Sequence, residues 1–225
     1  MTQEYLEKYL GQIQFSGVAH PDLKTLKTLQ EKHLNHFPFE NINTFLHQEV
    51  VLDAEHLCQK FIFQQRGGYC FEQNLFFMDV LTTIGFEVRP LLGRVTVPFG
   101  RLGRTHQLLL ITIQNTQYIV DVGFGGMVYP QPLLLKADII QETALNDYRL
   151  RLEENTYHVE ILLNEEWNSI YTFDCSEYIF PDIIIANWYI STHPASHFTK
   201  ELMISRIKGT TRYNLRNNQL SIYQK

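Results

Sequence analysis

Residues 66–74, with the sequence RGGYCFEQN, contain the side chain that is best suited to nucleophilic chemistry. Cys70 follows two glycines, which permit a sharp turn, and it opens an apolar stretch that predicts a helix. Unpaired N–H groups and the helix dipole favour a thiolate at such a position. We therefore predict that Cys70 is a nucleophile. The alternative is a small core residue, because buried cysteines are common.

A thiolate nucleophile needs a base and a third group that orients the base. His106 and Asp121 are the candidates, and both lie in apolar segments with strand-like patterning. Burial without a partner would cost either side chain roughly 2 to 7 kcal/mol, which pairing with each other avoids. The alternatives are a histidine that bonds to the backbone and an aspartate that caps a strand end.

The turn between these two segments decides whether His106 and Asp121 meet. A turn centred on residues 114–115 places Asp121 opposite Leu108, on the same face of the hairpin as His106 and diagonal to it. A turn centred on residues 115–116 moves the pair two residues further apart. The sequence allows both registers.

Glu40 lies among apolar residues in the segment HFPFEN and must therefore be either exposed or paired. Arg66 is the partner that we expect, and the pair would brace the turn that carries Cys70. This role is structural and not catalytic. The alternative is a solvated glutamate.

Three arginines precede the histidine, with no acidic residue between positions 88 and 120: Arg94, Arg101 and Arg104. They could receive the phosphate groups of a cofactor, although a solvated loop is the favoured alternative. The sequence GFGG at residues 123–126 is weak as a phosphate-binding motif, because no helix pattern follows it. Its glycines instead suit close backbone approach to Cys70 or to a ligand.

The sequence does not indicate a metal site. Several histidines occur in the N-terminal part, but no cysteine or carboxylate completes a ligand set at recognised spacing. We expect surface or capping positions for His33, His36, His47 and His56. The cysteines at 58, 70 and 175 lack CxxC spacing, so neither a zinc ribbon nor a disulfide framework is expected.

The elements that must position these residues change character along the chain. Leucines at helical spacing follow Pro21 and Asp22, Asp53 is placed as the N-cap of a second helix, and Gly85 as the end of a third. From about Glu87 the apolar pattern has period two and β-branched residues gather, with short connectors that favour antiparallel pairing.

We therefore predict an α+β protein in three parts. Residues 1–85 would form a helical bundle that carries the nucleophile, 86–185 an antiparallel β-barrel that carries the histidine and aspartate, and 186–225 a shortened α/β lid. A tight turn at Asn217 and Asn218 would join a last strand pair.

Composition restricts the class of partner. The chain has 225 residues, 44% of them hydrophobic, and a formal net charge of −5. This composition is typical of a globular protein. The negative net charge argues against a generic nucleic-acid binder and against binding to an anionic membrane surface. No signal-like start or membrane-length apolar run occurs, so we expect a cytoplasmic protein with small-molecule partners, as a monomer or a homodimer.

Five segments together resemble those of the arylamine N-acetyltransferase family of the bacterial type, and they occur in the family's order. They are HFPFEN (36–41), RGGYCFEQN (66–74), THQLLL (105–110), YIVDVGFGG (118–126) and STHPASHF (191–198). One such block would be a weak signal, whereas five in order are specific.

The resemblance implies Cys70 as acyl-accepting nucleophile, His106 as base and Asp121 as orienting acid. It implies acetyl-CoA as acyl donor, no metal, and ping-pong transfer to arylamines, arylhydrazines or N-hydroxyarylamines, as in xenobiotic metabolism. The residues that it places near the acceptor or the pantetheine are Phe37, Phe71, Thr105, Phe124, Gly125 and Phe198.

Other functions use the same triad. A papain-like or transglutaminase-like hydrolase would pass the acyl group to water, an amide synthase would take it from a biosynthetic intermediate, and a non-enzymatic descendant would only bind ligands. Family members also continue for several tens of residues beyond the end of this sequence. We therefore expect a more open cleft and weaker CoA binding, or a dimer that covers the gap.

Overall fold

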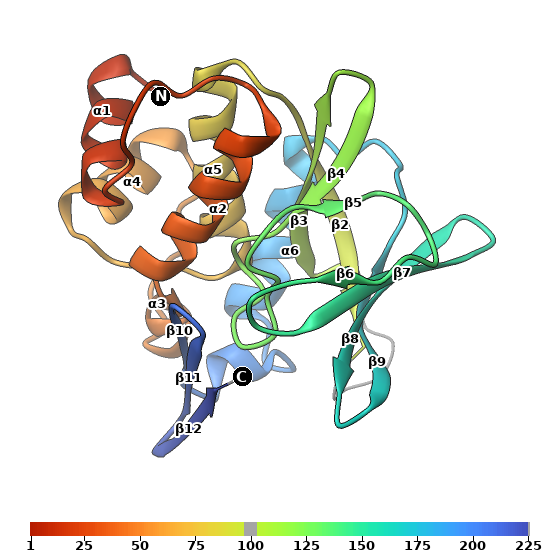
Figure 1. Cartoon of the computed structure of the whole chain (residues 1–225). Coiled ribbons are helices and arrows are strands. Elements are labelled where there is room, and N and C mark those ends of the chain that lie inside the picture. Colours follow the sequence, from red (N-terminus) through yellow and green to blue (C-terminus); the bar gives the residue numbers. More distant parts are fainter. Residues whose placement is uncertain (97–102, 225) are drawn as a thin grey trace.

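The computed structural model describes residues 1–96 and 103–224. Helices from the N-terminal part lie on one side of the molecule and a large curved sheet lies on the other, with a C-terminal hairpin below the helices (Figure 1). The helical segments are α1 (Gln3–Gln12), α2 (Leu23–His36), α3 (Ile42–Phe45), α4 (Ala54–Cys58), η1 (Gln59–Phe63), α5 (Cys70–Ile84), α6 (Phe180–Thr192) and η2 (His197–Thr199).

Local signals in the sequence set the ends of these helices. Asp22 caps α2 and its carboxylate accepts from the Thr25 N–H at 2.7 Å, while Asp53 caps α4 and accepts from the His56 N–H at 2.9 Å. Gly85 ends α5 with a φ of 106°, a conformation that glycine adopts without strain. The three predicted helix boundaries are therefore confirmed.

The larger sheet has eight strands in the order β5-β4-β3-β2-β9-β8-β7-β6, and all its pairings are antiparallel. The strands are β2 (Glu87–Val95), β3 (His106–Ile113), β4 (Thr116–Val120), β5 (Leu133–Leu134), β6 (Gln141–Glu142), β7 (Asp147–Glu153), β8 (Thr156–Leu163) and β9 (Glu166–Phe173). The sheet curls into a barrel-like shape, and the predicted α+β class is confirmed (Figure 1).

A smaller antiparallel sheet joins a strand of the N-terminal part to the C-terminal strands. Its order is β1-β10-β11-β12, so the short strand β1 (Phe39–Glu40), which follows α2, pairs with the C-terminal hairpin. The hairpin strands are β10 (Met203–Lys208), β11 (Thr211–Arg216) and β12 (Gln219–Gln224). Position 186 lies inside α6. The division at 85 and 186 stays a prediction.

The hairpin of β3 and β4 adopts the first of the two registers allowed by the sequence. Leu109 pairs with Val120, and Gln114 and Asn115 at the turn have φ values of 46° and 64°. Two consecutive residues with positive φ are typical of the tight turn whose twist matches a β-hairpin. This register brings Asp121, just beyond β4, to the same end of the sheet as His106.

Candidate active site

Cys70 is the first residue of α5 and lies at the junction of the helices and the barrel. Its side chain is 4% exposed and faces a cavity, and its sulfur lies 3.9 Å from the carbonyl oxygen of Thr105. The preceding residue, Tyr69, donates its N–H to Glu72 Oε2 at 3.1 Å, which satisfies one of the unpaired N–H groups at the helix start. The nucleophile candidate is thus held at a defined helix N-terminus.

His106, at the start of β3, lies between Cys70 and Asp121. Its Nε2 is 2.7 Å from Asp121 Oδ2, and Cys70 is close enough to contribute to the pKa of the ring. Burial lowers the pKa of His106, but the Asp121 charge and hydrogen bond, together with Cys70, raise the pKa to about 10. The structure therefore brings together the three residues that the sequence nominated.

Asp121 is fully buried and its second carboxylate oxygen is held by two donors. Oδ1 accepts from Asn74 Nδ2 at 3.1 Å and from the Gly123 N–H at 2.8 Å. Asn74 also accepts from the Val122 N–H at 3.1 Å and donates to the Gln107 carbonyl at 2.7 Å. Asn74 therefore links α5 to β3, which begins with His106, and to the segment after β4 that contains Asp121.

The close approach expected at the glycines of residues 123–126 is present. A Cβ atom on Gly123 would lie 2.5 Å from the Cα of Cys70, and one on Gly126 would lie 2.7 Å from the Asn214 amide. Glycine is thus required where this loop passes the nucleophile.

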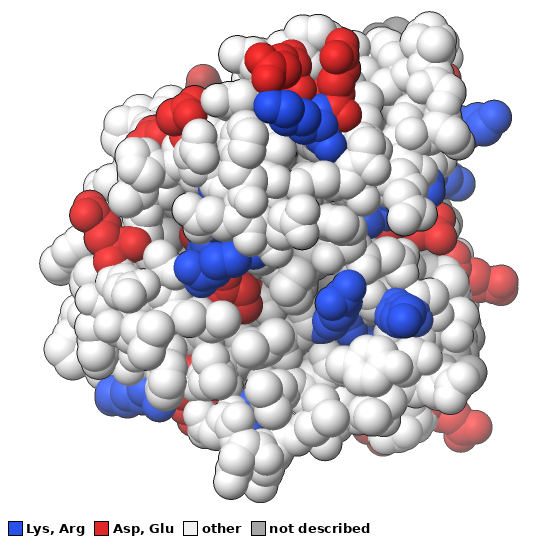
Figure 2. Space-filling model, turned by 90° about the vertical axis from the view of Figure 1, so that its left-hand side faces the viewer, with Lys and Arg blue, Asp and Glu red and all other residues white. Residues whose placement is uncertain are grey.

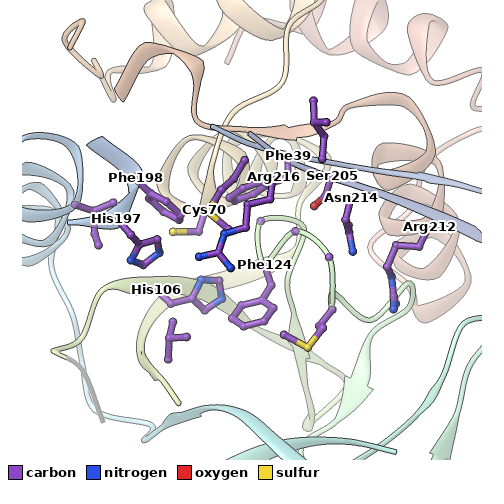
Figure 3. A pocket seen from close by; sticks show the side chains of 18 of the residues that line it. Phe39, Cys70, His106, Phe124, His197, Phe198, Ser205, Arg212, Asn214 and Arg216 are labelled. Carbon is purple, nitrogen blue, oxygen red and sulfur yellow. The ribbon is translucent and has the colours of Figure 1, made fainter. Parts of the chain in front are cut away.

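A cavity of about 410 Å³ opens in front of the triad. In Figure 3 Cys70, His106, Phe124 and Phe198 surround its inner part, and Arg212, Asn214 and Ser205 come from the C-terminal hairpin. Phe124 contacts His106 edge-on, with ring centroids 5.0 Å apart. The site thus combines a buried nucleophile and base with aromatic walls, an arrangement suited to acyl transfer to a flat substrate.

Comparison with known proteins agrees with this geometry. A sequence model of the N-acetyltransferase family matches residues 22–225. The chain is 38% identical to the arylamine N-acetyltransferase of Escherichia coli over 203 residues, which cover 89% of this chain and 72% of that protein. It is 36% identical to the Mycolicibacterium smegmatis enzyme, covering 96% of this chain and 81% of the relative.

The chain belongs to the arylamine N-acetyltransferase family. Solved structures of arylamine N-acetyltransferases share its fold: the Salmonella typhimurium protein has a TM-score of 0.94 at 36% identity, with 100% of this chain and 82% of that chain covered. The Mycobacterium marinum protein in complex with CoA has a TM-score of 0.93 at 34% identity, with 97% and 83% covered. The chain is therefore an acyltransferase.

Other residues nominated by the family resemblance are divided between the cavity and the core. Thr105, Phe124, Gly125 and Phe198 line the cavity. Phe37 is 2% exposed and packs among aromatic rings of the helical part, and Phe71 is fully buried and contacts Tyr69 edge-on. The aromatic residue of HFPFEN that lines the cavity is Phe39, two positions further along the chain.

The expected pair of Glu40 and Arg66 is present within a larger buried cluster. Arg66 Nη2 donates to Glu40 Oε1 at 2.7 Å, and Lys60 Nζ lies 3.5 Å from the same oxygen and 2.5 Å from Glu72 Oε1. Burial raises the pKa of Glu72, and Lys60 opposes this effect. Lys60 and Glu72 were missed, although a lysine and a glutamate inside apolar helical segments are a signal of buried pairing.

The arginine residues before β3 are partly used within the protein. Arg104 Nη2 donates to Asp174 Oδ2 at 2.5 Å, and Arg101 lies outside the described residues. On the face shown in Figure 2, acidic and basic side chains are interspersed between wide uncharged areas. That face carries no continuous basic surface.

The histidine predictions need one correction. His33 is neither exposed nor a cap: it is fully buried, lies 3.1 Å from the Tyr9 hydroxyl through Nδ1, and lies 2.7 Å from Gln73 Oε1 through Nε2. Burial lowers its pKa to about 3, so its role in the core is that of a neutral polar group. Its two polar partners come from α1 and α5, which helical periodicity alone does not reveal.

The described residues contain neither a cluster suited to a metal ion nor a helix suited to crossing a membrane. Within 1–96 and 103–224, no three histidine, cysteine, aspartate or glutamate side chains are grouped so that they could hold a metal ion. In the same ranges, every helix is too short or too polar to cross a membrane.

Proposed function

We propose that this family member transfers an acetyl group from acetyl-CoA to an arylamine, an arylhydrazine or an N-hydroxyarylamine through an acetyl-cysteine at Cys70. The observation that carries the proposal is the position of His106, which bonds to Asp121 and lines the same aromatic cavity as Cys70. Relatives named for this activity, and one solved with CoA, support the donor and acceptor classes.

In the first half-reaction the Cys70 thiolate attacks the thioester carbonyl carbon of acetyl-CoA. The bond between this carbon and the CoA sulfur breaks, and the CoA thiolate leaves with the proton held by His106. The N–H of Cys70 has no acceptor within α5, because it opens the helix, and it is available to the developing oxyanion. One such donor is worth about 2.7 to 4 kcal/mol.

In the second half-reaction the acceptor nitrogen, or the oxygen of an N-hydroxyarylamine, attacks the acetyl carbon on Cys70. His106 takes the proton from the attacking atom, and the bond to the Cys70 sulfur breaks. The thiolate and the protonated imidazole are thereby restored. Asp121 holds the imidazole with Nε2 toward itself throughout both steps.

The decisive experiment treats the enzyme with acetyl-CoA alone. We expect a burst of free CoA equal to the number of active sites, one acetyl group on the peptide that contains Cys70, and its removal when an arylamine is added. Acetate release that needs no amine would indicate a hydrolase. Absence of the acetyl group would contradict transfer from this donor and leave an amide synthase or a non-enzymatic binder.

Cys58→Ser is the matched control, because Cys58 is another buried thiol. It is 2% exposed in α4, and burial raises its pKa to about 11, so it holds its proton at neutral pH. Cys70→Ser should abolish the acetyl adduct, whereas Cys58→Ser should retain it.

A further inference from the structure

α6 is apolar on both of its sides, which is unusual for a helix at the surface of a protein. One side is buried: Ile183, Ala186 and Ile190 pack inward, and Ile190 lines the cavity in front of Cys70. The other side is exposed and equally apolar. Together with the residue before the helix it forms a surface that we call the α6 patch: Ile179, Phe180, Ile184, Ile185, Trp188 and Tyr189, each 38–68% exposed. A helix that is apolar all round is normally buried all round, so the patch is suited to a contact.

The α6 patch is continuous and large. Phe180, Ile184 and Trp188 are spaced four residues apart and form one ridge along the helix, and Ile185 and Tyr189 form the neighbouring ridge. At roughly 200 to 250 Å² for a fully exposed residue of these types, the patch presents on the order of 700 Å². The largest apolar patch of a typical monomer is about 300 to 600 Å², whereas each partner of a specific protein interface buries about 800 Å². The patch therefore has the size of an interface.

A groove of about 750 Å³ lies beside the α6 patch. Ile185 and Tyr189 belong to both the patch and the groove, and Arg104, Glu177 and Asp182 also line the groove, so it carries charges of both signs. A ridge next to a groove lets a surface pack against a rotated copy of itself, because the ridge of each copy can enter the groove of the other. Opposite charges along the groove can face each other across the same contact.

These features favour a second copy of the chain over a lipid surface. Helices that lie in a membrane interface carry lysine and arginine on their polar face. α6 contains neither, its one charged residue is Asp182, and the whole chain has a net charge of −5. A second copy instead supplies apolar surface of the same size for the patch and charges of both signs for the groove.

We propose that two copies of this chain associate through their α6 patches about a two-fold axis, with the ridge that contains Trp188 in the groove of the other copy. This inference is independent of the proposed function. α6 runs along the junction between the helices and the barrel (Figure 1), and Ile190 reaches the cavity from its opposite side. Thr105 lines both the groove and the cavity, and its carbonyl oxygen is 3.9 Å from the Cys70 sulfur. The partner copy would therefore lie directly behind the nucleophile.

The first test measures the mass of the wild-type protein in solution. Sedimentation equilibrium is recorded between about 1 and 100 μM, the range in which a dimer of micromolar affinity forms. We expect the mass to rise from that of the 26.5 kDa chain toward twice this value as the concentration increases. A mass of one chain at every concentration would overturn the proposal.

The second test places a charge in the α6 patch. Trp188→Glu and Ile185→Glu should each raise the dissociation constant of the dimer about 30-fold or more, as the loss of a central anchor does. Ile140→Glu is the matched control, because Ile140 is 62% exposed but belongs neither to the patch nor to the groove. It should associate as the wild type does. A dimer that persists unchanged in both patch variants would place the contact elsewhere and contradict the proposal.

Tryptophan fluorescence tests the contact without a change in the patch. The chain has two tryptophans, Trp167 on β9 and Trp188, so in Trp167→Phe the emission comes from Trp188 alone. Dilution over the same concentration range should shift this emission to longer wavelength, because Trp188 becomes exposed to water as the copies separate. This measurement also decides the question if the glutamate variants do not fold. Emission that is constant on dilution but shifts to shorter wavelength with phosphatidylcholine vesicles would assign the patch to a lipid surface and overturn the dimer.

Discussion

His106 Nε2 and Asp121 Oδ2 lie 2.7 Å apart, and both side chains are almost inaccessible to solvent. Burial alone would lower the pKa of His106, so the net rise to about 10 comes from the Asp121 carboxylate and, to a smaller extent, from Cys70. The imidazole therefore holds its proton across the neutral range. This proton is the one that leaves with CoA in the proposed first half-reaction.

Asp121→Asn should reverse the direction of this pKa shift. With the charge removed, burial dominates, and we expect the pKa of His106 to fall below its ordinary value of 6.5. Histidine ring resonances followed by NMR should titrate near 10 in the wild type and in the acidic range in the variant. We also expect kcat to fall about 10²- to 10⁴-fold, the usual contribution of a positioned base. An unchanged titration midpoint would contradict the assigned pairing.

The same shift predicts how stability depends on pH. Because the folded-state pKa lies above the unfolded value near 6.5, the contribution of the His106–Asp121 pair is fully present below that pH and is lost as pH rises through about 10. The difference in unfolding free energy between wild type and Asp121→Asn should therefore be largest at acidic pH. Chemical denaturation at several pH values measures it.

Gly123→Ala tests the close passage of the loop over the nucleophile. The added Cβ would lie 2.5 Å from the Cα of Cys70 and 2.9 Å from Asn74 Nδ2, so backbone must move. We expect the unfolding free energy to fall by about 1 to 3 kcal/mol, as overpacking produces. The rate of Cys70 acetylation should fall by a larger fraction than the unfolding free energy does. Thermal unfolding and burst kinetics report the two effects.

Gly11→Ala is the control for this substitution. No heavy atom lies within 4 Å of the position of the new Cβ, and Gly11 is inside α1. Alanine there should leave activity unchanged and stabilise the protein by up to about 1 kcal/mol. A Gly123→Ala enzyme as stable and as active as Gly11→Ala would show that the loop has room to move.

The comparison of sequence and structure shows which features are set locally. The starts at Asp22 and Asp53 and the end at Gly85 depend on neighbouring backbone groups, and all three were predicted. For the β3–β4 hairpin the sequence allowed two registers and could not choose between them. The structure has the register in which Asp121 bonds to both His106 and Asn74, and these contacts come from tertiary packing rather than from the turn.

Features that depend on distant parts of the chain were missed. The partners of Asn74, Lys60 and Arg212 come from distant parts of the chain, and no sequence spacing encodes these contacts. The wrong prediction for His33 has the same origin, because its two partners lie on other helices. A polar residue on an apolar stripe indicates that a partner exists, but only tertiary packing identifies it.

Lys60→Met should be severely destabilising at neutral pH. It leaves the buried Glu72 carboxylate, 4% exposed, without its cation, and breaking such a pair costs about 3 to 5 kcal/mol. The pKa of Glu72 is already raised by burial, and without Lys60 it should rise further. Because the protonated form then fits the fold better, the destabilisation should shrink as pH falls. Urea unfolding at neutral and mildly acidic pH measures this trend.

Lys8→Met provides the exposed counterpart. Lys8 pairs with Glu4 at 2.7 Å, but the two side chains are 44% and 71% exposed. Its loss should change the unfolding free energy by less than about 1 kcal/mol at either pH. Equal destabilisation of Lys60→Met and Lys8→Met would show that the buried cluster of Glu40, Lys60, Arg66 and Glu72 has no special structural role.

Phe37 and Phe124 offer the sharpest contrast between the family resemblance and the geometry. Phe37 packs against Tyr9 and Phe61 with centroid separations of 6.1 and 5.3 Å, inside the helical core, whereas Phe124 faces the cavity and contacts the His106 ring. Phe124→Leu should raise the acceptor KM about 2- to 10-fold, the value of one aromatic contact, with little change in stability.

Phe37→Leu should instead lower the unfolding free energy by about 1 to 3 kcal/mol, because it disrupts core packing, and should leave the acceptor KM unchanged. Steady-state kinetics at saturating acetyl-CoA and denaturant unfolding separate the two variants. A raised KM without lost stability in Phe37→Leu would mean that Phe37 reaches the acceptor when substrate binds. The aromatic wall would then extend into the helical core, and Phe39 would no longer be the residue of HFPFEN that meets the substrate.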